Sequence, residues 1–238
     1  MIVVTLTSWT KRIGNVKKVV ESIMDNTVQP DRVYLNLSKT EFNGIPLPED
    51  LVEYFNSDER LIINWVPGPN TKAMKKVFPI LEYLEDDDII IDADDDILFP
   101  KDLIESRIKD FERHDRKCCI TSNIKRSVGF NGKMNVVSAM SLFQKKMFNK
   151  WQKLFTQEII DTNNDDRTYL TIIWLNGYLS VGCTKWSVQD LLKSYTMNPN
   201  DSLSGSKQIK MGRVYDRIAQ SVFSKTSTKN IIDSFGYW

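Results

Sequence analysis

The sequence predicts an α/β fold with a central, mainly parallel sheet, and three observations lead to this prediction. A β-branched run at residues 2–9 is followed by helical spacing of apolar residues over 13–26 and by a second apolar run at 32–38. Strand and helix patterns then alternate in the same way, at 60–66, 71–84, 88–94 and 100–114. Strands that alternate with helices pair in parallel, because each helix carries the chain back to the start of the next strand.

The remaining elements follow a less regular pattern. Residues 39–60 hold two prolines and are typical of a loop with a short helix. The run 88–94 is apolar at its centre, which predicts a central place in the sheet. We also expect strands and helices in the second half, at 117–123, 135–144, 167–177 and 212–223.

The composition excludes several classes of protein. A net charge of +1 argues against a nucleic-acid-binding protein, and 41% apolar residues suffice for a sizeable core. The three cysteines are an odd number without a C-x-x-C spacing, so we expect a reducing compartment and neither a disulfide framework nor a zinc site. Because no leader pattern and no apolar run of membrane-spanning length occurs, we expect a cytoplasmic protein.

Acidic residues are concentrated around the fourth predicted strand. Nine Asp and Glu side chains, and no Lys or Arg, lie between residues 82 and 96. Asp94, Asp95 and Asp96 follow the strand directly, at the edge where open α/β sheets bind ligands. Adjacent carboxylates repel one another unless a cation compensates, and their oxygens suit Mg²⁺ or Mn²⁺. The motif DADDD therefore predicts a metal–diphosphate site; a solvated acidic turn is the alternative.

This motif and four further segments resemble a known enzyme family. DADDDILFP (92–100) is similar to the Asp-x-Asp motif of GT-A-type nucleotide-sugar glycosyltransferases of the family-2-like group. Other segments are similar to parts of bacterial polysaccharide glycosyltransferases and occur in the same order, at 5–13, 30–38, 68–81 and 163–170. The resemblance covers roughly residues 1–180. It implies a GT-A-like, Rossmann-type mixed sheet in one domain, divided into a nucleotide-binding half (1–115), an acceptor and catalytic half (116–197) and a basic tail (198–238).

The resemblance also implies roles for individual residues. Asp96 is expected to be the direct metal ligand, Asp94 to face the ribose or the metal, and Asp95 to lie between them in the donor site. Asp92 is one step early and is expected to be structural. The positions that match the region around the nucleotide donor are Thr5, Thr7, Arg12, Lys72 and Lys76. For the two lysines, solvated positions on an amphipathic helix are an equally good interpretation.

A second acidic pair, Asp165 and Asp166, opens a predicted helix. Capping of the free N–H groups at the helix start is one interpretation. The resemblance implies a catalytic base instead, because inverting transfer requires a carboxylate that takes the proton of the acceptor hydroxyl. We expect Asp166 to be the base, with Asp165 as the second candidate.

The implied activity is transfer of a sugar from a nucleotide donor, a UDP-sugar, to a glycan or lipid-linked glycan in surface polysaccharide or lipopolysaccharide synthesis. A sugar-phosphate nucleotidyltransferase is the weaker alternative. Such an enzyme would need a Gly-rich phosphate loop after the first strand, and the only glycine near that strand is Gly14. A non-catalytic protein that binds nucleotide sugars is the third possibility.

The C-terminal segment is basic: residues 205–229 carry six Lys or Arg side chains against one Asp. Lys207 and Lys210 are candidates for contact with the donor diphosphate. Peripheral contact with an anionic membrane and simple packing on the domain are the alternatives. We make one expectation for each of three other residues. His114 is expected to end a helix, Trp174 to lie in the core and Trp151 to line an acceptor groove.

Overall fold

The computed structural model describes residues 1–122, 140–194 and 196. A seven-stranded mixed sheet has the order β3-β2-β1-β4-β6-β5-β7. The strands are β1 (Ile2–Thr7), β2 (Arg32–Ser38), β3 (Leu61–Val66), β4 (Ile89–Ala93), β5 (Cys118–Thr121), β6 (Leu142–Gln144) and β7 (Leu179–Gly182). The prediction of an α/β fold with a mainly parallel sheet is confirmed, since β1, β2, β3 and β4 are mutually parallel and only β6 runs antiparallel to its neighbours.

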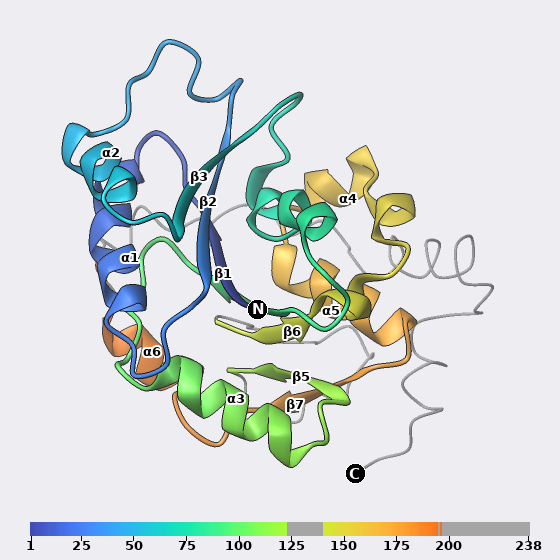
Figure 1. Cartoon of the computed structure of the whole chain (residues 1–238). Helices are drawn as coiled ribbons and strands as arrows, with labels where there is room; N and C mark the ends of the chain where they lie inside the picture. The colour runs from blue at the N-terminus through green and yellow to red at the C-terminus, as the bar shows by residue number, and fades with distance from the viewer. Residues whose placement is uncertain (123–139, 195, 197–238) are drawn as a thin grey trace.

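Helices cover both faces of this sheet, as Figure 1 shows. The α-helices are α1 (Val16–Met24), α2 (Glu49–Asn56), α3 (Leu103–Arg113), α4 (Gln157–Thr162), α5 (Asp165–Leu175) and α6 (Val188–Leu191). In the view of Figure 1, α1 and α2 lie on one side of β1 to β3, and α4 and α5 lie on the other. The α1 helix forms because Val16, Val19, Val20 and Ile23 recur at helical spacing and are all buried.

The segment 71–84 differs from the expected amphipathic helix. It forms two 3₁₀ helices, η2 (Lys72–Lys76) and η3 (Phe78–Tyr83), which meet at Val77. Pro79 explains the break, because it has no N–H for the carbonyl of Lys75 and it disfavours α-helical geometry at Phe78. The other short 3₁₀ helices are η1 (Ile13–Asn15), η4 (Lys145–Phe148), η5 (Trp151–Leu154) and η6 (Leu192–Ser194).

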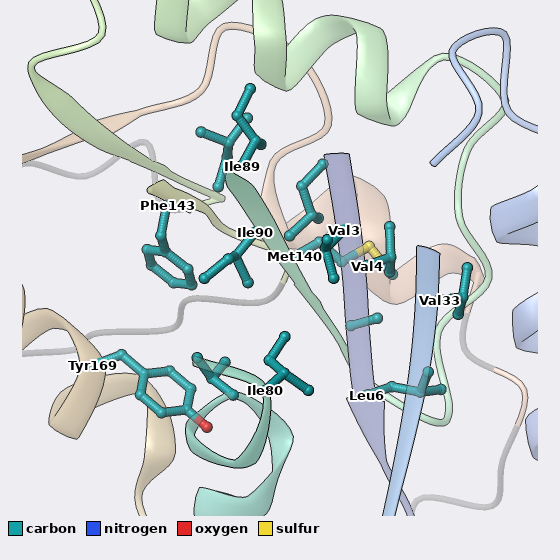
Figure 2. Packing of buried hydrophobic residues seen from close by; sticks show 14 of the residues in the cluster. Val3, Val4, Leu6, Val33, Ile80, Ile89, Ile90, Met140, Phe143 and Tyr169 are labelled. Atoms are coloured by element: carbon teal, nitrogen blue, oxygen red, sulfur yellow. The ribbon is translucent and has the colours of Figure 1, made fainter. Parts of the chain in front are cut away.

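The core joins the two halves of the chain. Figure 2 shows Ile90 of β4 beside Phe143 of β6. Phe78 packs edge-to-face on Tyr169, with ring centroids 5.3 Å apart, and it stacks on Trp151 at 4.9 Å. Each such buried aromatic side chain contributes about 1.5–3 kcal/mol to folding. The acidic edge of β4 and the start of α5 are thereby fixed on one body.

Predicted element boundaries mostly agree with the structure. β4 is the middle strand of the seven, as its apolar centre predicted. His114 is the residue that ends α3, and Trp174 is buried within α5, as expected. The predicted tail helix at 212–223 lies outside the described residues, as do residues 135–139 of a predicted strand. Elements that the sequence did not indicate are α4, α6 and β7.

Candidate active site

The two acidic motifs meet at the carboxyl ends of the central parallel strands. β1 and β4 are neighbours in register, with Thr5 beside Asp92 and Leu6 beside Ala93. The residues that follow each strand, Ser8 and Asp95, are therefore close, and the Ser8 hydroxyl donates to Asp95 Oδ2 at 2.6 Å. This edge is where open α/β sheets bind ligands.

Lys76 connects the Asp-x-Asp motif with the acidic pair of α5. Its Nζ lies 2.7 Å from Asp94 Oδ1 and donates a hydrogen bond to it. The same Nζ lies 2.8 Å from Asp165 Oδ2, as an ion pair without the alignment of a hydrogen bond. The side chain of Lys76 is 8% exposed, whereas that of Asp94 is 31% exposed. The cluster is thus buried on the lysine side and open to a ligand on the Asp94 side.

The charges of this cluster hold one another in place. Burial by itself lowers the pKa of Lys76, but the carboxylates of Asp165 and Asp94 outweigh burial and raise that pKa well above its ordinary value. Burial also raises the pKa of Asp92 well above the usual range, opposed by Lys76. Asp92 accepts a hydrogen bond from the backbone N–H of Ser141, as expected for a structural residue.

The main chain of Lys76 is held by a buried polar network at the ends of β1 and β2. Thr5 donates its hydroxyl to the carbonyl of Lys76, and Asn36 Nδ2 donates to that carbonyl at 3.1 Å. Asn36 in turn accepts a bond from Asn64 Nδ2 at 2.7 Å, and Thr7 donates to the carbonyl of Asn36 at 2.7 Å. Thr5 and Thr7 therefore both contact the protein's own main chain, and Thr5 contacts Lys76 directly.

Arg12 forms ion pairs with the other two carboxylates of the motif, those of Asp95 and Asp96. Its Nη2 is 3.2 Å from Asp95 Oδ1 and forms an ion pair with Asp96 Oδ2. Burial raises the pKa of Asp95, while Arg12 and Ser8 act in the opposite direction. The resemblance places Arg12 in the region around the nucleotide donor, and in the structure it contacts two of the Asp-x-Asp carboxylates.

The start of α5 explains how the second acidic pair is presented. Asn164 accepts the N–H of Arg167 at 2.9 Å and caps the helix. Asp165 and Asp166 occupy the first turn, where the helix dipole favours negative charge. Because Asn164 already performs the side-chain capping, the two aspartates remain available to the acidic cluster, and both act electrostatically on Lys76.

The donor set fits a hard divalent cation only in part. Among the described residues, no group of three or more His, Cys, Asp or Glu side chains has the arrangement of a complete metal cage. Mg²⁺ and Mn²⁺ sites of this chemistry need one or two carboxylates, with substrate phosphates as further ligands. Five carboxyl groups gather around the two cations Arg12 and Lys76, which leaves an excess of negative charge, as such a cation would require. The carboxyl groups are those of Asp94, Asp95, Asp96, Asp165 and Asp166.

Several predicted site residues lie apart from this cluster. Lys72 forms an exposed ion pair with Asp161 at 3.3 Å. Trp151 stacks on Phe78 and packs against the core, so the stacked face is not available for an acceptor sugar. Lys207 and Lys210 lie outside the described residues.

Sequence reasoning missed four residues that the structure brings to this edge. Ser8 and Asn36 lie near the carboxyl ends of the predicted strands 2–9 and 32–38, so their position was a usable signal. Lys75 is buried beside Asn70 and Glu41, and burial lowers its pKa. Thr196 bonds to the carbonyl of Asp96 across 100 residues of sequence, and no local pattern could have indicated that contact.

The chain matches no protein-family model, and no curated protein matches it by sequence. Solved structures do resemble it. The fold is similar to S. aureus TarS residues 1–349 in complex with UDP, with a TM-score of 0.60 and 12% identity over 98% of this chain and 70% of that one. It is also similar to the mannosyltransferase PcManGT from Pyrobaculum calidifontis in complex with GDP-Man and Mn²⁺, with a TM-score of 0.54 and 16% identity over 76% and 55% of the two chains.

These likenesses establish the fold that the sequence resemblance implied. The protein has a GT-A glycosyltransferase-like fold, with the mixed, mainly parallel sheet of that class. Among the described residues, every helix is too short or too polar to cross a bilayer.

Proposed function

We propose that the protein is a metal-dependent glycosyltransferase that moves a sugar from a UDP-sugar to a glycan hydroxyl. One observation carries this proposal. Lys76 joins an acidic motif at the end of β4 to a second acidic pair at the start of α5, within a GT-A-like fold. A site that holds a donor diphosphate on one side and a proton acceptor on the other requires such a pairing of two acidic groups.

Asp94 and Asp96 would hold Mn²⁺ or Mg²⁺, which neutralises the diphosphate leaving group when bound. Arg12 and Lys76 orient these carboxylates, because each basic group contacts one of them directly. The 31% exposed side chain of Asp94 is accessible to an incoming donor.

Asp166 is the proposed base for the acceptor hydroxyl. Lys76 Nζ already lies 2.8 Å from Asp165 Oδ2, so this carboxylate is engaged within the protein. Asp166 shares the first turn of α5 and the same electrostatic environment. Direct attack by a hydroxyl that Asp166 deprotonates would invert the anomeric centre.

The proposed acceptor is a glycan or lipid-linked glycan of surface polysaccharide or lipopolysaccharide synthesis. This part of the proposal rests on the resemblance of the sequence segments to bacterial polysaccharide glycosyltransferases. Such an acceptor would bring the enzyme to the cytoplasmic face of the inner membrane. The basic segment 205–229 supplies the positive charge that peripheral contact with anionic lipid requires.

A thermal-shift screen of nucleotide sugars tests the proposal. Each donor is added once with Mn²⁺ and once with EDTA. Mn²⁺ without any nucleotide is the control. We expect UDP-sugars to raise the melting temperature only when Mn²⁺ is present, because the metal joins the carboxylates to the diphosphate. Release of UDP from the best donor then separates an enzyme from a binding protein. Equal stabilisation by all nucleotides in EDTA would contradict the proposal.

A further inference from the structure

The main chain of the Asp-x-Asp motif is held by a remote part of the chain. The backbone N–H of Thr196 donates to the carbonyl of Asp96 at 2.8 Å, and its hydroxyl donates to the same carbonyl at 3.0 Å. Two residues after Asp96, the N–H of Leu98 donates to the carbonyl of Ser194 at 3.1 Å. Asp96 and Leu98 are thereby paired with Thr196 and Ser194, although 100 residues separate Thr196 from Asp96.

The side chain of Asp96 is held from a different direction. Arg12 follows β1 and pairs with Asp96 Oδ2, while it also reaches Asp95. Arg12 is itself fixed by a turn, because its N–H donates to the carbonyl of Trp9 at 2.9 Å. The side chain of Asp96 is thus fixed by Arg12 and its main chain by Thr196, and both contacts come from residues remote in sequence.

We infer that Thr196 is a positioning residue for Asp96 and acts together with Arg12. This inference rests on the proposed function, in which Asp96 is a metal ligand. A carboxylate binds a metal tightly only when its orientation is set in advance, and the groups that orient metal ligands influence affinity strongly. Arg12 fixes the carboxylate of Asp96, and Thr196 fixes the peptide from which that carboxylate projects. Thr196 has no direct part in the reaction.

The test compares Thr196→Val with Thr196→Ser. Valine keeps the shape and the backbone N–H but loses the hydroxyl bond, whereas serine keeps that bond. Thr27→Val is the matched control, because it removes a hydroxyl bond to Glu105 on the exposed surface. Binding of Mn²⁺ in the presence of UDP is measured by electron paramagnetic resonance, without acceptor and therefore without turnover.

We expect Thr196→Val to weaken Mn²⁺ binding about tenfold, the low end of the range for groups that orient metal ligands. Thr196→Ser and Thr27→Val should bind as the wild type does. UDP binding in EDTA should be the same in all four proteins. Equal Mn²⁺ affinity of Thr196→Val and the wild type would overturn the inference, and so would an equal loss in Thr196→Ser.

A second measurement separates this inference from the proposed function. Hydrogen exchange of the Leu98 amide in the metal-free protein reports the pairing with Ser194 directly. Thr196→Val should accelerate that exchange about fivefold, the factor that corresponds to one neutral hydrogen bond. Accelerated exchange in a protein that never binds Mn²⁺ and UDP would refute the proposed function while the positioning of residue 96 stands. Unchanged exchange would refute the positioning itself.

Discussion

Lys76 Nζ lies 2.8 Å from Asp165 Oδ2, although 89 residues separate the two in sequence. The contact joins the end of η2 to the first turn of α5, and Asp94 completes it from the end of β4. A single buried ammonium group therefore sets the distance between the two halves of the proposed active site.

Lys76→Met should destabilise the fold strongly. Removal of one partner from a buried ion pair leaves uncompensated charge and costs about 3–5 kcal/mol of unfolding free energy. Urea titration at pH 7 measures this loss. Lys72→Met is the matched control, because Lys72 pairs with Asp161 on the surface, where the contribution is small. An equal effect of the two substitutions would show that the pairing of Lys76 is not a buried one.

Asp166→Asn should lower turnover by about two to four orders of magnitude, the usual contribution of a general base. Donor affinity should change little, since the amide keeps the shape of the side chain. Steady-state kinetics at saturating donor measure the effect. Asp161→Asn, on the exposed face of α4, serves as the control. If Asp166→Asn instead weakened donor binding at normal turnover, the role of the pair would be donor binding.

Cys118 should resist alkylation in the native protein. Burial raises the pKa of this thiol from 9.0 to about 12. At pH 8 the thiolate population, and with it the rate of reaction with iodoacetamide, should fall about a thousandfold below that of the unfolded chain. Because the unfolded thiol ionises first, stability should also fall as the pH rises from about 9 towards 12. Mass spectrometry after labelling with and without urea measures the reactivity. Rapid native labelling at Cys118 would contradict the burial.

Lys207→Ala combined with Lys210→Ala should weaken donor binding. These lysines belong to the basic segment 205–229, and they are the candidates for contact with the donor diphosphate. Loss of two charge-assisted contacts should lower affinity about a hundredfold, and less so at high salt. Calorimetry with UDP and Mn²⁺ measures the change. Lys225→Ala combined with Lys229→Ala is the matched control. An equal loss of donor affinity in that variant would indicate a general charge effect.

Much of the first half could be read from the sequence, because its signals are local. The buried runs that became β1, β2 and β4 are apolar and β-branched, and the helical spacing of α1 needs only its own residues. The position of Asp94 to Asp96 at a strand end also followed from local order. Pro79 was visible as a break, but no local pattern indicated the two 3₁₀ helices around it or the packing of η2 against β1 and β2.

The details of the candidate site depend on contacts between distant residues. The sequence indicated a place near the donor for Arg12 and Lys76, but it could not indicate that both pair with the protein's own carboxylates. No local pattern around Trp151 distinguishes a core position from a groove. Its packing against the core is seen only in its stacking on Phe78. Thr196 lies in a segment without a motif, and its role follows only from where the chain returns to β4.

Calorimetric titration of UDP into the wild type and into Asp96→Asn, each with and without Mn²⁺, tests the central claim most directly. Asp86→Asn is the control, an exposed acid of the same stretch that pairs with Lys145. The wild type and the control should bind UDP with Mn²⁺ and much more weakly in EDTA. Asp96→Asn should lose at least about tenfold in the Mn²⁺-dependent affinity, the least that even indirect changes at metal sites cost. Unaltered Mn²⁺-dependent binding by Asp96→Asn would contradict the assignment of the Asp-x-Asp motif.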